Sequence, residues 1–189
     1  MELWSNEVME DLSLHMLDIA ENSIDAGATR VEIEITISKS ADRLVLKIRD
    51  NGKGMDEETI RKVKDPFFTT KTVRAKKFGL GIPLLAQAAE ECNGRFLIDS
   101  EIGKGTVIAA EFQRSHIDMK PLGDIGSTMA VLISGHPEID FLLSYERNGF
   151  SYRLDTDELK EELNDVPINL PDVLRLIKDD INSALKGEI

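Results

Sequence analysis

Two consecutive segments of strictly alternating polarity constrain this chain more than any other feature of its sequence. Residues 29–38 and 43–50 read TRVEIEITIS and RLVLKIRD, with an apolar side chain at every second position. Successive side chains of a strand point to opposite faces of a sheet, so each segment predicts a strand buried on one face. The four residues KSAD between them suit a hairpin loop. The apolar positions are Val31, Ile33, Ile35 and Ile37 in the first strand and Leu44, Leu46 and Ile48 in the second.

Helical patterns stand on both sides of this hairpin. Apolar residues recur at helical spacing from Leu12 to Ala26, with Gly27 as a stop, and Asp56 opens a second, short helix. After Pro83, LLAQAAEEC predicts a helix closed by Asn93–Gly94. FLIDS and TVIAAEF then form a second hairpin around the turn EIGKG. Residues 1–114 are therefore expected to form a two-layer α/β sandwich.

Residues 115–189 have a different character. DIGSTMAVLIS predicts a helix ending at Gly135, and the turn Arg147-Asn148-Gly149 joins IDFLLSYE and FSYRLD in a predicted hairpin. Thr156 or Asp157 is the expected cap of the helix DELKEEL, and a final helix starts at Pro171. We expect a small α+β extension whose role the sequence does not reveal.

Composition and charge exclude several classes of protein. The chain has 189 residues and a net charge of −12, which argues against nucleic-acid binding. No apolar run approaches the ~20 residues that span a bilayer. The start MELWSNEVMEDL lacks the basic region and apolar core of a signal peptide, so a cytoplasmic protein without membrane contact is expected. Residues 61–77 nevertheless carry seven basic residues against one acid. That stretch is either a solvated surface or a site for a compact anion such as a nucleoside triphosphate.

Four short motifs follow one another along the predicted scaffold. DIAENSIDAGA starts at Asp18 and places Asn22 four residues on, on the same helix face. DNGKGM follows the second strand directly, and GKGT forms the turn of the second hairpin. PFFTTK leads into Gly79-Leu80-Gly81 before a helix, where backbone N–H groups can reach phosphate oxygens. Each motif alone also occurs as an ordinary cap, turn or surface segment.

In this order and on this scaffold the motifs resemble the GHKL ATP-binding domain, also called the Bergerat fold. That family includes sensor histidine kinases, DNA gyrase, the MutL mismatch-repair proteins and the large heat-shock chaperone. The resemblance covers about residues 8–114. It implies that this chain binds ATP with magnesium and that a lid, residues 67–81, closes over the phosphates.

The resemblance also assigns roles to residues. It implies that Asn22 coordinates magnesium, that Asp50 accepts a hydrogen bond from the adenine amino group, and that Thr106 supports the same edge of the base. Gly52 and Gly54 would let the backbone lie against the purine, and Met55 would pack on its ring. The lid would contribute Phe68, Thr69, Thr70, Lys71, Gly79, Leu80 and Gly81 near the phosphates.

Departures from the family pattern bear on activity. Members that hydrolyse ATP carry a glutamate where this chain has Asp18, a candidate base whose carboxylate is set back by one methylene. The resemblance therefore implies slow hydrolysis, or none without a partner. SHIDMKPL has the Ser-His and Pro-Leu spacing of a kinase phosphoacceptor segment but no acidic residue directly after His116. Phosphoacceptor and plain linker histidine both stay open for His116.

Two classes of function follow. The first is an ATPase or a kinase-like phosphotransferase whose lid couples nucleotide state to a protein partner. The second is a non-catalytic, nucleotide-gated interaction module of the anti-sigma or chaperone kind, with the acidic segment 157–189 as its surface. A MutL-like DNA role would need a basic face, which the sequence lacks. The partner and the oligomeric state, a homodimer included, stay open.

Overall fold

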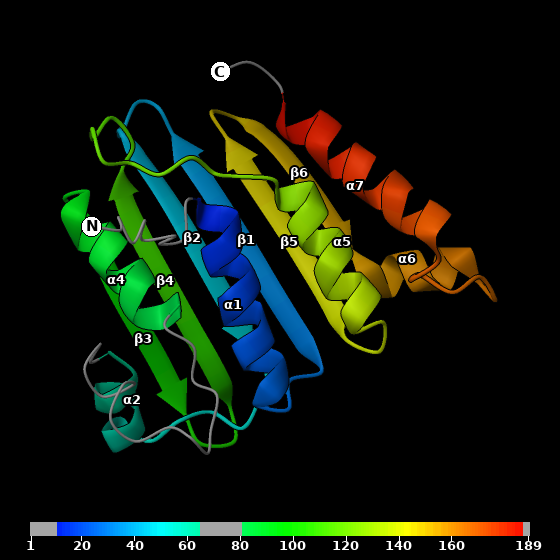
Figure 1. Ribbon diagram of the computed structural model, residues 1–189, viewed down its shortest axis with the longest axis horizontal. Coiled ribbons are helices and arrows are strands. Elements are labelled where there is room, and N and C mark those ends of the chain that lie inside the picture. Colours follow the sequence, from blue (N-terminus) through cyan, green and yellow to red (C-terminus); the bar gives the residue numbers. More distant parts are fainter. Residues whose placement is uncertain (1–10, 65–80, 187–189) are drawn as a thin grey trace, which may run out of the picture.

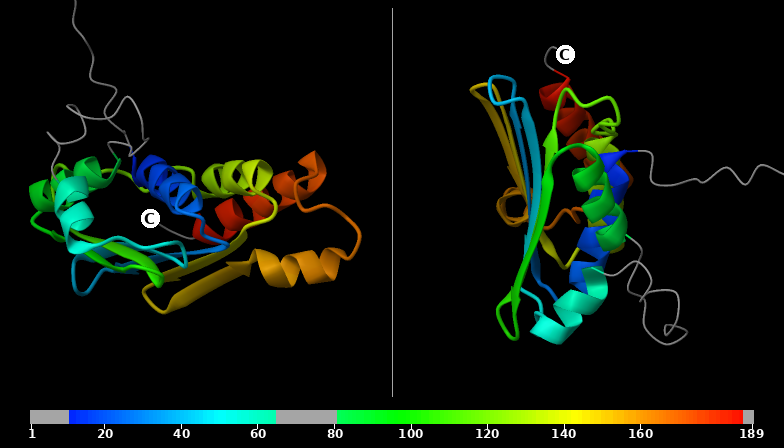
Figure 2. Two further views of the ribbon diagram at one scale, coloured as in Figure 1. Left: turned by 90° about the horizontal axis from the view of Figure 1, so that it is seen from below. Right: turned by 90° about the vertical axis from the view of Figure 1, so that its left-hand side faces the viewer.

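The computed structural model describes residues 11–64 and 81–186 (Figure 1). Its elements in chain order are α1 (Leu12–Asp25), β1 (Arg30–Ser38), β2 (Arg43–Asp50), α2 (Glu57–Lys64), α4 (Gly81–Glu91), β3 (Arg95–Glu101), β4 (Gly105–Gln113), α5 (Ile125–Gly135), β5 (Asp140–Arg147), β6 (Phe150–Asp155), α6 (Thr156–Leu163) and α7 (Pro171–Leu185). The strands form one sheet in the order β3-β4-β2-β1-β5-β6. Helices α1, α4, α5 and α7 cover one face of it (Figure 2). The predicted α/β sandwich of two layers is confirmed.

The alternating segments form the centre of this sheet. β1 and β2 pair antiparallel from Val31 opposite Asp50 to Ser38 opposite Arg43. Val31, Ile33 and Ile35 are at most 1% exposed, whereas the polar residues between them lie on the other face. Fully burying one such aliphatic side chain contributes roughly 1.5–3 kcal/mol. This apolar stripe therefore fixes which face the helices cover.

Helix α1 lies over the two central strands and begins and ends as the sequence predicts. The Asp11 side chain accepts a hydrogen bond from the backbone N–H of Leu14, which caps the helix start. Gly27 follows the helix end with a φ of +81°, a conformation that favours glycine. Met16 and Ala20 are fully buried against the sheet. Asp18 and Asn22 on another side of α1 stay partly exposed.

Residues after 115 continue the same sheet. β5 pairs in parallel with β1, from Arg30 opposite Asp140 to Ile37 opposite Arg147, and β6 pairs antiparallel with β5. Their hairpin turn has positive φ angles at Asn148 and Gly149, as its sequence predicts. Helix α5 packs against both α1 and α7 (Figure 1). The predicted elements of this region are all present, and they join one continuous sheet.

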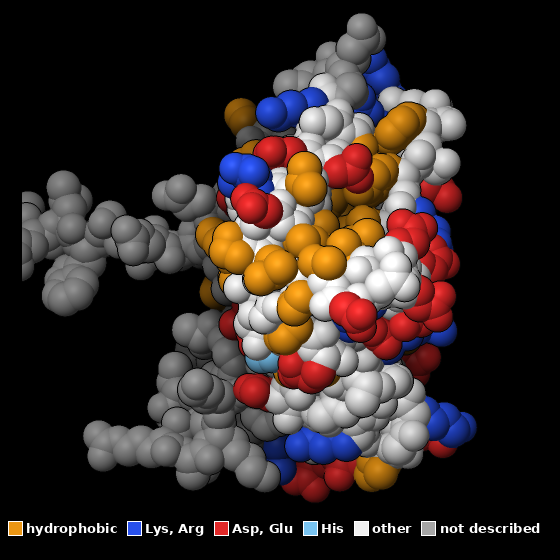
Figure 3. Space-filling view, turned by 90° about the vertical axis from the view of Figure 1, so that its right-hand side faces the viewer, with side chains coloured by type: hydrophobic (Ala, Val, Ile, Leu, Met, Phe, Trp, Pro, Cys, Tyr) orange, Lys and Arg blue, Asp and Glu red, His pale blue; other side chains and the backbone are white. Residues whose placement is uncertain are grey.

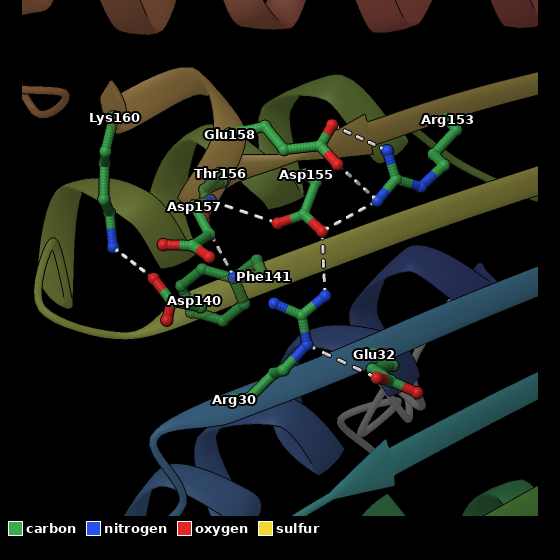
Figure 4. A network of polar contacts seen from close by, with 10 residues as sticks. All are labelled: Arg30, Glu32, Asp140, Phe141, Arg153, Asp155, Thr156, Asp157, Glu158 and Lys160. Atoms are coloured by element: carbon green, nitrogen blue, oxygen red, sulfur yellow. Dashed lines mark hydrogen bonds and ion pairs between the residues drawn. The ribbon is translucent and has the colours of Figure 1, made fainter. Parts of the chain in front are cut away.

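A network of hydrogen bonds and ion pairs connects β5, β6 and α6 to the central strand β1 (Figure 4). Arg30 on β1 donates to Asp155 at 2.8 Å, and Arg153 on β6 reaches the same carboxylate oxygen at 3.0 Å. Burial alone would raise the pKa of Asp155, but hydrogen bonds from Arg30 and the Asp157 N–H, with both arginine charges, lower it below its ordinary value. Asp155 also caps α6, so the predicted cap at Thr156 or Asp157 is wrong. The Thr156 hydroxyl instead accepts from the Phe141 N–H.

Within residues 11–64 and 81–186, no helix has both the length and the apolar composition that a membrane crossing requires.

Candidate functional site

A cavity of about 410 Å³ opens at one end of the sheet, beside the C-terminal end of α1. Its volume lies in the range of small-molecule sites. The chain segments around it are α1, the loop after β2, α2, the start of α4, and the β3–β4 hairpin. Five residues singled out from the sequence line it: Asn22, Asp50, Gly54, Met55 and Thr106. Apolar walls come from Ile19, Ile82, Ile102 and Ile108. Such walls suit a flat, apolar ring.

Asp50 ends β2 and is 8% exposed. One carboxylate oxygen, Oδ1, accepts from the backbone N–H of Gly52 at 2.8 Å and of Thr106 at 3.2 Å. The other, Oδ2, accepts from the Ser23 hydroxyl at 2.8 Å. A carboxylate offers about four acceptor sites, so these three donors leave one on Oδ2. A buried acceptor in the lining of a cavity favours a ligand that carries a hydrogen-bond donor, N–H or O–H.

Asn22 and Asp18 lie one turn apart on α1, as the spacing predicts. The Asn22 side-chain amide donates to Asp18 Oδ2 at 3.1 Å, which leaves the amide oxygen of Asn22 without a donor among the described residues. Burial raises the pKa of Asp18, while hydrogen bonds from Asn22 and the Gly81 backbone oppose that shift. A Cβ atom on Gly81 would stand 2.0 Å from Asp18 Oδ2. Only glycine at position 81 therefore lets α4 approach this carboxylate.

Glycine at position 54 has a structural reason of its own. Its φ is +66°, and a Cβ there would lie 2.0 Å from the Glu101 carbonyl oxygen. The requirement for glycine thus comes from the close approach of the β3–β4 hairpin. At Gly52 a Cβ would meet Asp50 Oδ1 at 3.0 Å, a tight contact with the carboxylate itself. Both glycines let the loop after β2 close around Asp50.

Sequence reasoning missed two hydroxyl residues that organise the cavity. Ser23 donates to Asp50, and its position directly after Asn22 was the available signal. Ser100 on β3 accepts from the Met55 N–H at 2.8 Å and lies 2.9 Å from the Thr106 hydroxyl. No local pattern marks Ser100, because only strand pairing brings it beside Thr106.

The predicted lid lies mostly outside the described residues. Only Gly81 is described, and it begins α4 beside Asp18. The remaining lid residues named above are Phe68, Thr69, Thr70, Lys71, Gly79 and Leu80, and they fall outside the described ranges.

The three histidines occupy different environments. Thr106 lies near the start of β4, whereas His116 comes shortly after the end of that strand at Gln113. The Nδ1 atom of His116 accepts from the Asp118 N–H at 3.2 Å. About 23 Å of strand separates Thr106 from Gln113 at ~3.3 Å per residue. His136 follows α5, and its Nε2 lies 3.1 Å from a Glu21 carboxylate oxygen. His15 is buried in the core.

The fold is a two-layer α/β sandwich with a cavity of small-molecule size, and comparison with known proteins gives its family. Residues 8–116 match the family model described as "Histidine kinase-, DNA gyrase B-, and HSP90-like ATPase". The chain belongs to this family, and its matched region is an ATPase domain of the histidine kinase type. This confirms the GHKL resemblance.

Individual relatives agree with the family. Sporulation kinase C of Bacillus subtilis (strain 168) is 34% identical over 91 residues, which are 48% of this chain and 21% of that protein. Sensor histidine kinase YvrG of the same strain is 29% identical over 116 residues, 60% of this chain and 19% of that protein. The chain thus spans about a fifth of the length of these curated relatives.

A solved structure supports the fold. The crystal structure of the N-terminal domain of a DNA repair protein superimposes with a TM-score of 0.53 and 16% sequence identity. The match covers 80% of this chain and 54% of that one. At this identity the likeness shows a shared fold alone.

Proposed function

We propose that this cavity binds ATP with magnesium, and that the chain either hydrolyses ATP slowly or transfers its γ-phosphoryl group to a partner. The observation that carries the proposal is Asp50. This buried carboxylate has three protein donors and one acceptor site left, set among apolar walls. An adenine amino group is a donor on a flat ring, which matches both properties.

The residues beside Asp50 fit a magnesium–triphosphate group. Mg²⁺ keeps several waters and binds through one or two protein oxygens together with substrate phosphates. The Asn22 amide oxygen is such a ligand, and its side chain lines the cavity. Among the described residues, no group of three or more His, Cys, Asp or Glu side chains could hold a metal alone. The metal would therefore arrive with the nucleotide.

Asp18 is the candidate base of a hydrolysis reaction. Burial raises the pKa of Asp18, and a base works best when its pKa approaches the working pH. Its carboxylate is held by Asn22, so the proposed base and the proposed metal ligand are oriented together. The shorter arm of aspartate makes slow turnover the expected rate.

Phosphoryl transfer needs an acceptor that reaches the cavity. His116 follows the opposite end of β4 from Thr106, so transfer to it would proceed between two chains. An acceptor on a partner protein satisfies the same geometry. Intact-mass measurement after incubation with Mg·ATP at neutral pH separates these outcomes: a phosphoryl adduct supports a kinase, and phosphate release without an adduct supports an ATPase.

Base recognition is tested with Asp50→Asn. The new side chain keeps an oxygen for Gly52 and Thr106, and the Ser23 hydroxyl can turn to accept from its NH₂. The variant should therefore fold, while the group at position 50 that accepts from the ligand becomes a donor. We expect ATP affinity in calorimetry to fall about 10- to 100-fold, and ITP, whose base carries a carbonyl there, to bind better than ATP.

The matched control is Asp99→Asn, an exposed carboxylate on β3 outside the cavity. It should bind ATP as the unmodified chain does. Unchanged ATP affinity in Asp50→Asn would refute the assignment of Asp50. Asn22→Ala should remove the increase in affinity that magnesium gives, and binding that stays magnesium-dependent would refute the metal site.

A second function, nucleotide-gated binding of a protein partner, is favoured by one surface. Hydrophobic side chains gather in the middle of the face viewed in Figure 3, with acidic side chains beside them. On α7 and the turn before it, Leu176 is 66% exposed and Leu170 43%. Exposed apolar groups of this size mark interaction sites when they cluster. ATP binding with neither adduct nor phosphate release would favour this function.

A further inference from the structure

A second cavity, of about 780 Å³, lies at the end of the sheet opposite the first. It is bounded by the β1–β2 and β5–β6 turns, the segment 119–124 before α5, and the C-terminal end of α7. In Figure 1 these segments meet at the end of the molecule where α7 ends. None of the residues assigned above to the proposed nucleotide site lines this cavity.

The floor of this cavity is apolar and contains one polar group. Leu44, Ile125 and Tyr145 line it and are at most 4% exposed. Tyr145 is itself 98% buried, yet no described residue forms a hydrogen bond with its hydroxyl. The hydroxyl is not among the described side-chain atoms that are buried without a partner, so it reaches the open space of the cavity and can bond to a ligand there.

The rim is cationic in a protein of net charge −12. Lys39, Arg114, Lys120, Arg147 and Lys186 line the cavity. Four of them, all except Lys120, have no carboxylate within 4.0 Å among the described residues, whereas most other described Lys and Arg side chains form ion pairs. More than half of the described Lys and Arg side chains without an ion pair therefore line this cavity, and the others are Arg49, Lys53 and Lys64.

The single acidic residue of the lining is occupied elsewhere. Asp124 accepts from the Ser127 hydroxyl and its N–H at 2.8 Å, from the Asn182 amide at 2.9 Å, and lies 3.9 Å from Lys178. These contacts, the Ser127 hydroxyl first, lower the pKa of Asp124 to about 2. Its charge is balanced at the start of α5, so it does not neutralise the rim.

The walls are held in place before any ligand arrives. The Pro121 carbonyl accepts from the Leu12 N–H at 3.0 Å, which ties the segment 119–124 to α1. The Asn182 amide oxygen accepts from the Gly126 N–H at 3.1 Å, which ties α7 to α5. A site that is already formed loses little entropy on binding.

We propose that this cavity binds a small amphipathic anion: an apolar aromatic or acyl body with a carboxylate or phosphate group. The apolar body lies on the floor beside Tyr145, whose hydroxyl bonds to it or to its head group. The anionic group lies at the rim, beside Arg147 and Lys186. The volume, the apolar floor, the unpaired hydroxyl and the unpaired cations each match one part of that ligand.

The test uses residues 1–189 and two probes of equal shape, 2-naphthoate and the neutral 2-naphthamide, in calorimetric titrations with saturating Mg·ATP. We expect naphthoate to bind at one site at least about 10-fold more tightly than naphthamide. Arg147→Ala should remove most of that difference, and Tyr145→Phe should weaken binding without loss of packing. Arg49→Ala removes an unpaired arginine outside both cavities and should change nothing.

Several results would overturn the proposal. Equal affinity for the two probes would show that the cavity does not select an anionic group. Naphthoate binding that survives both Arg147→Ala and Tyr145→Phe would show that naphthoate binds outside this cavity. Arg147-dependent sedimentation with phosphatidylglycerol vesicles, without naphthoate binding, would assign the rim to a lipid surface. Naphthoate binding only after removal of residues 187–189 would make the chain's own terminus the occupant.

Discussion

His15 shows how one buried residue couples the stability of this protein to pH. It lies on α1 at 0% exposure, and neither ring nitrogen has a hydrogen-bond partner among the described residues. Burial, followed by the positive charge of Lys120, lowers the pKa of His15 from 6.5 to about 4. The imidazole is therefore neutral in the folded chain, and its protonation favours the unfolded chain.

The first prediction concerns this histidine. Between pH 6.5 and about 4 the unfolded chain binds a proton at position 15 that the folded chain does not, so stability falls as the pH falls through that window. The full shift corresponds to about 3 kcal/mol. His15→Leu has a similar volume and should flatten the fall in unfolding free energy, measured by urea titration at several pH values. An equally steep fall in the variant would contradict the buried, neutral histidine.

Helix α1 and the hairpin β3–β4 form two of the walls of the first cavity. One side of α1 buries Met16 and Ala20, while Asn22 on another side lines the cavity. The hairpin contributes Thr106, which stands opposite Asp50 in the register of β2 and β4. The contacts that pack these elements together are therefore also the contacts that set the geometry of the cavity.

The second prediction compares two glycines of this region. Gly54 and Gly103 both have positive φ, but a Cβ at 54 would overlap the Glu101 backbone, whereas a Cβ at 103 would meet nothing within 4 Å. In both alanine variants the backbone strain at positive φ lowers the unfolding free energy by about 1–2 kcal/mol. Gly54→Ala should be destabilised by at least about 2 kcal/mol more in urea unfolding and should lose ATP binding. Equal unfolding free energies of the two variants would show that the β3–β4 hairpin shifts at no cost to make room for a Cβ at position 54.

At the scale of the whole molecule, residues 115–189 complete the sheet that residues 1–114 begin. β1 has β2 on one side and β5 on the other, and Phe141 and Leu143 of β5 are fully buried. Helix α5 packs beside α1 on the same face (Figure 1). Removal of the C-terminal region would expose both an edge of β1 and an apolar surface.

The third prediction follows from that arrangement. A chain that ends at Arg114 should aggregate or lose cooperative unfolding, because an open apolar edge strand recruits other chains. Size-exclusion chromatography and circular dichroism during urea titration measure both properties, with the full chain unfolding in one transition. A soluble, cooperatively unfolding fragment would instead support two independent units divided near residue 115.

Local chemistry made much of this protein predictable from its sequence. Alternation at β1 and β2, the helix stop at Gly27 and the turn at Asn148-Gly149 depend on neighbours in the chain, so their patterns specify them directly. The motif residues Asn22 and Asp50 were assigned through the resemblance to the GHKL family, and both line the cavity.

Tertiary structure decided the rest. The parallel pairing of β5 with β1 leaves no local signal, because the paired residues lie more than a hundred positions apart. Ser100 and Ser23 became site residues through strand register and helix packing, and Asp155 became a cap because Arg30 holds it. The second cavity exists only where four separate chain segments meet. The sequence by itself thus determined the helices, the strands and the motif residues. Burial and long-range pairing determined the two cavities that those elements surround, because no single segment of the chain encodes them.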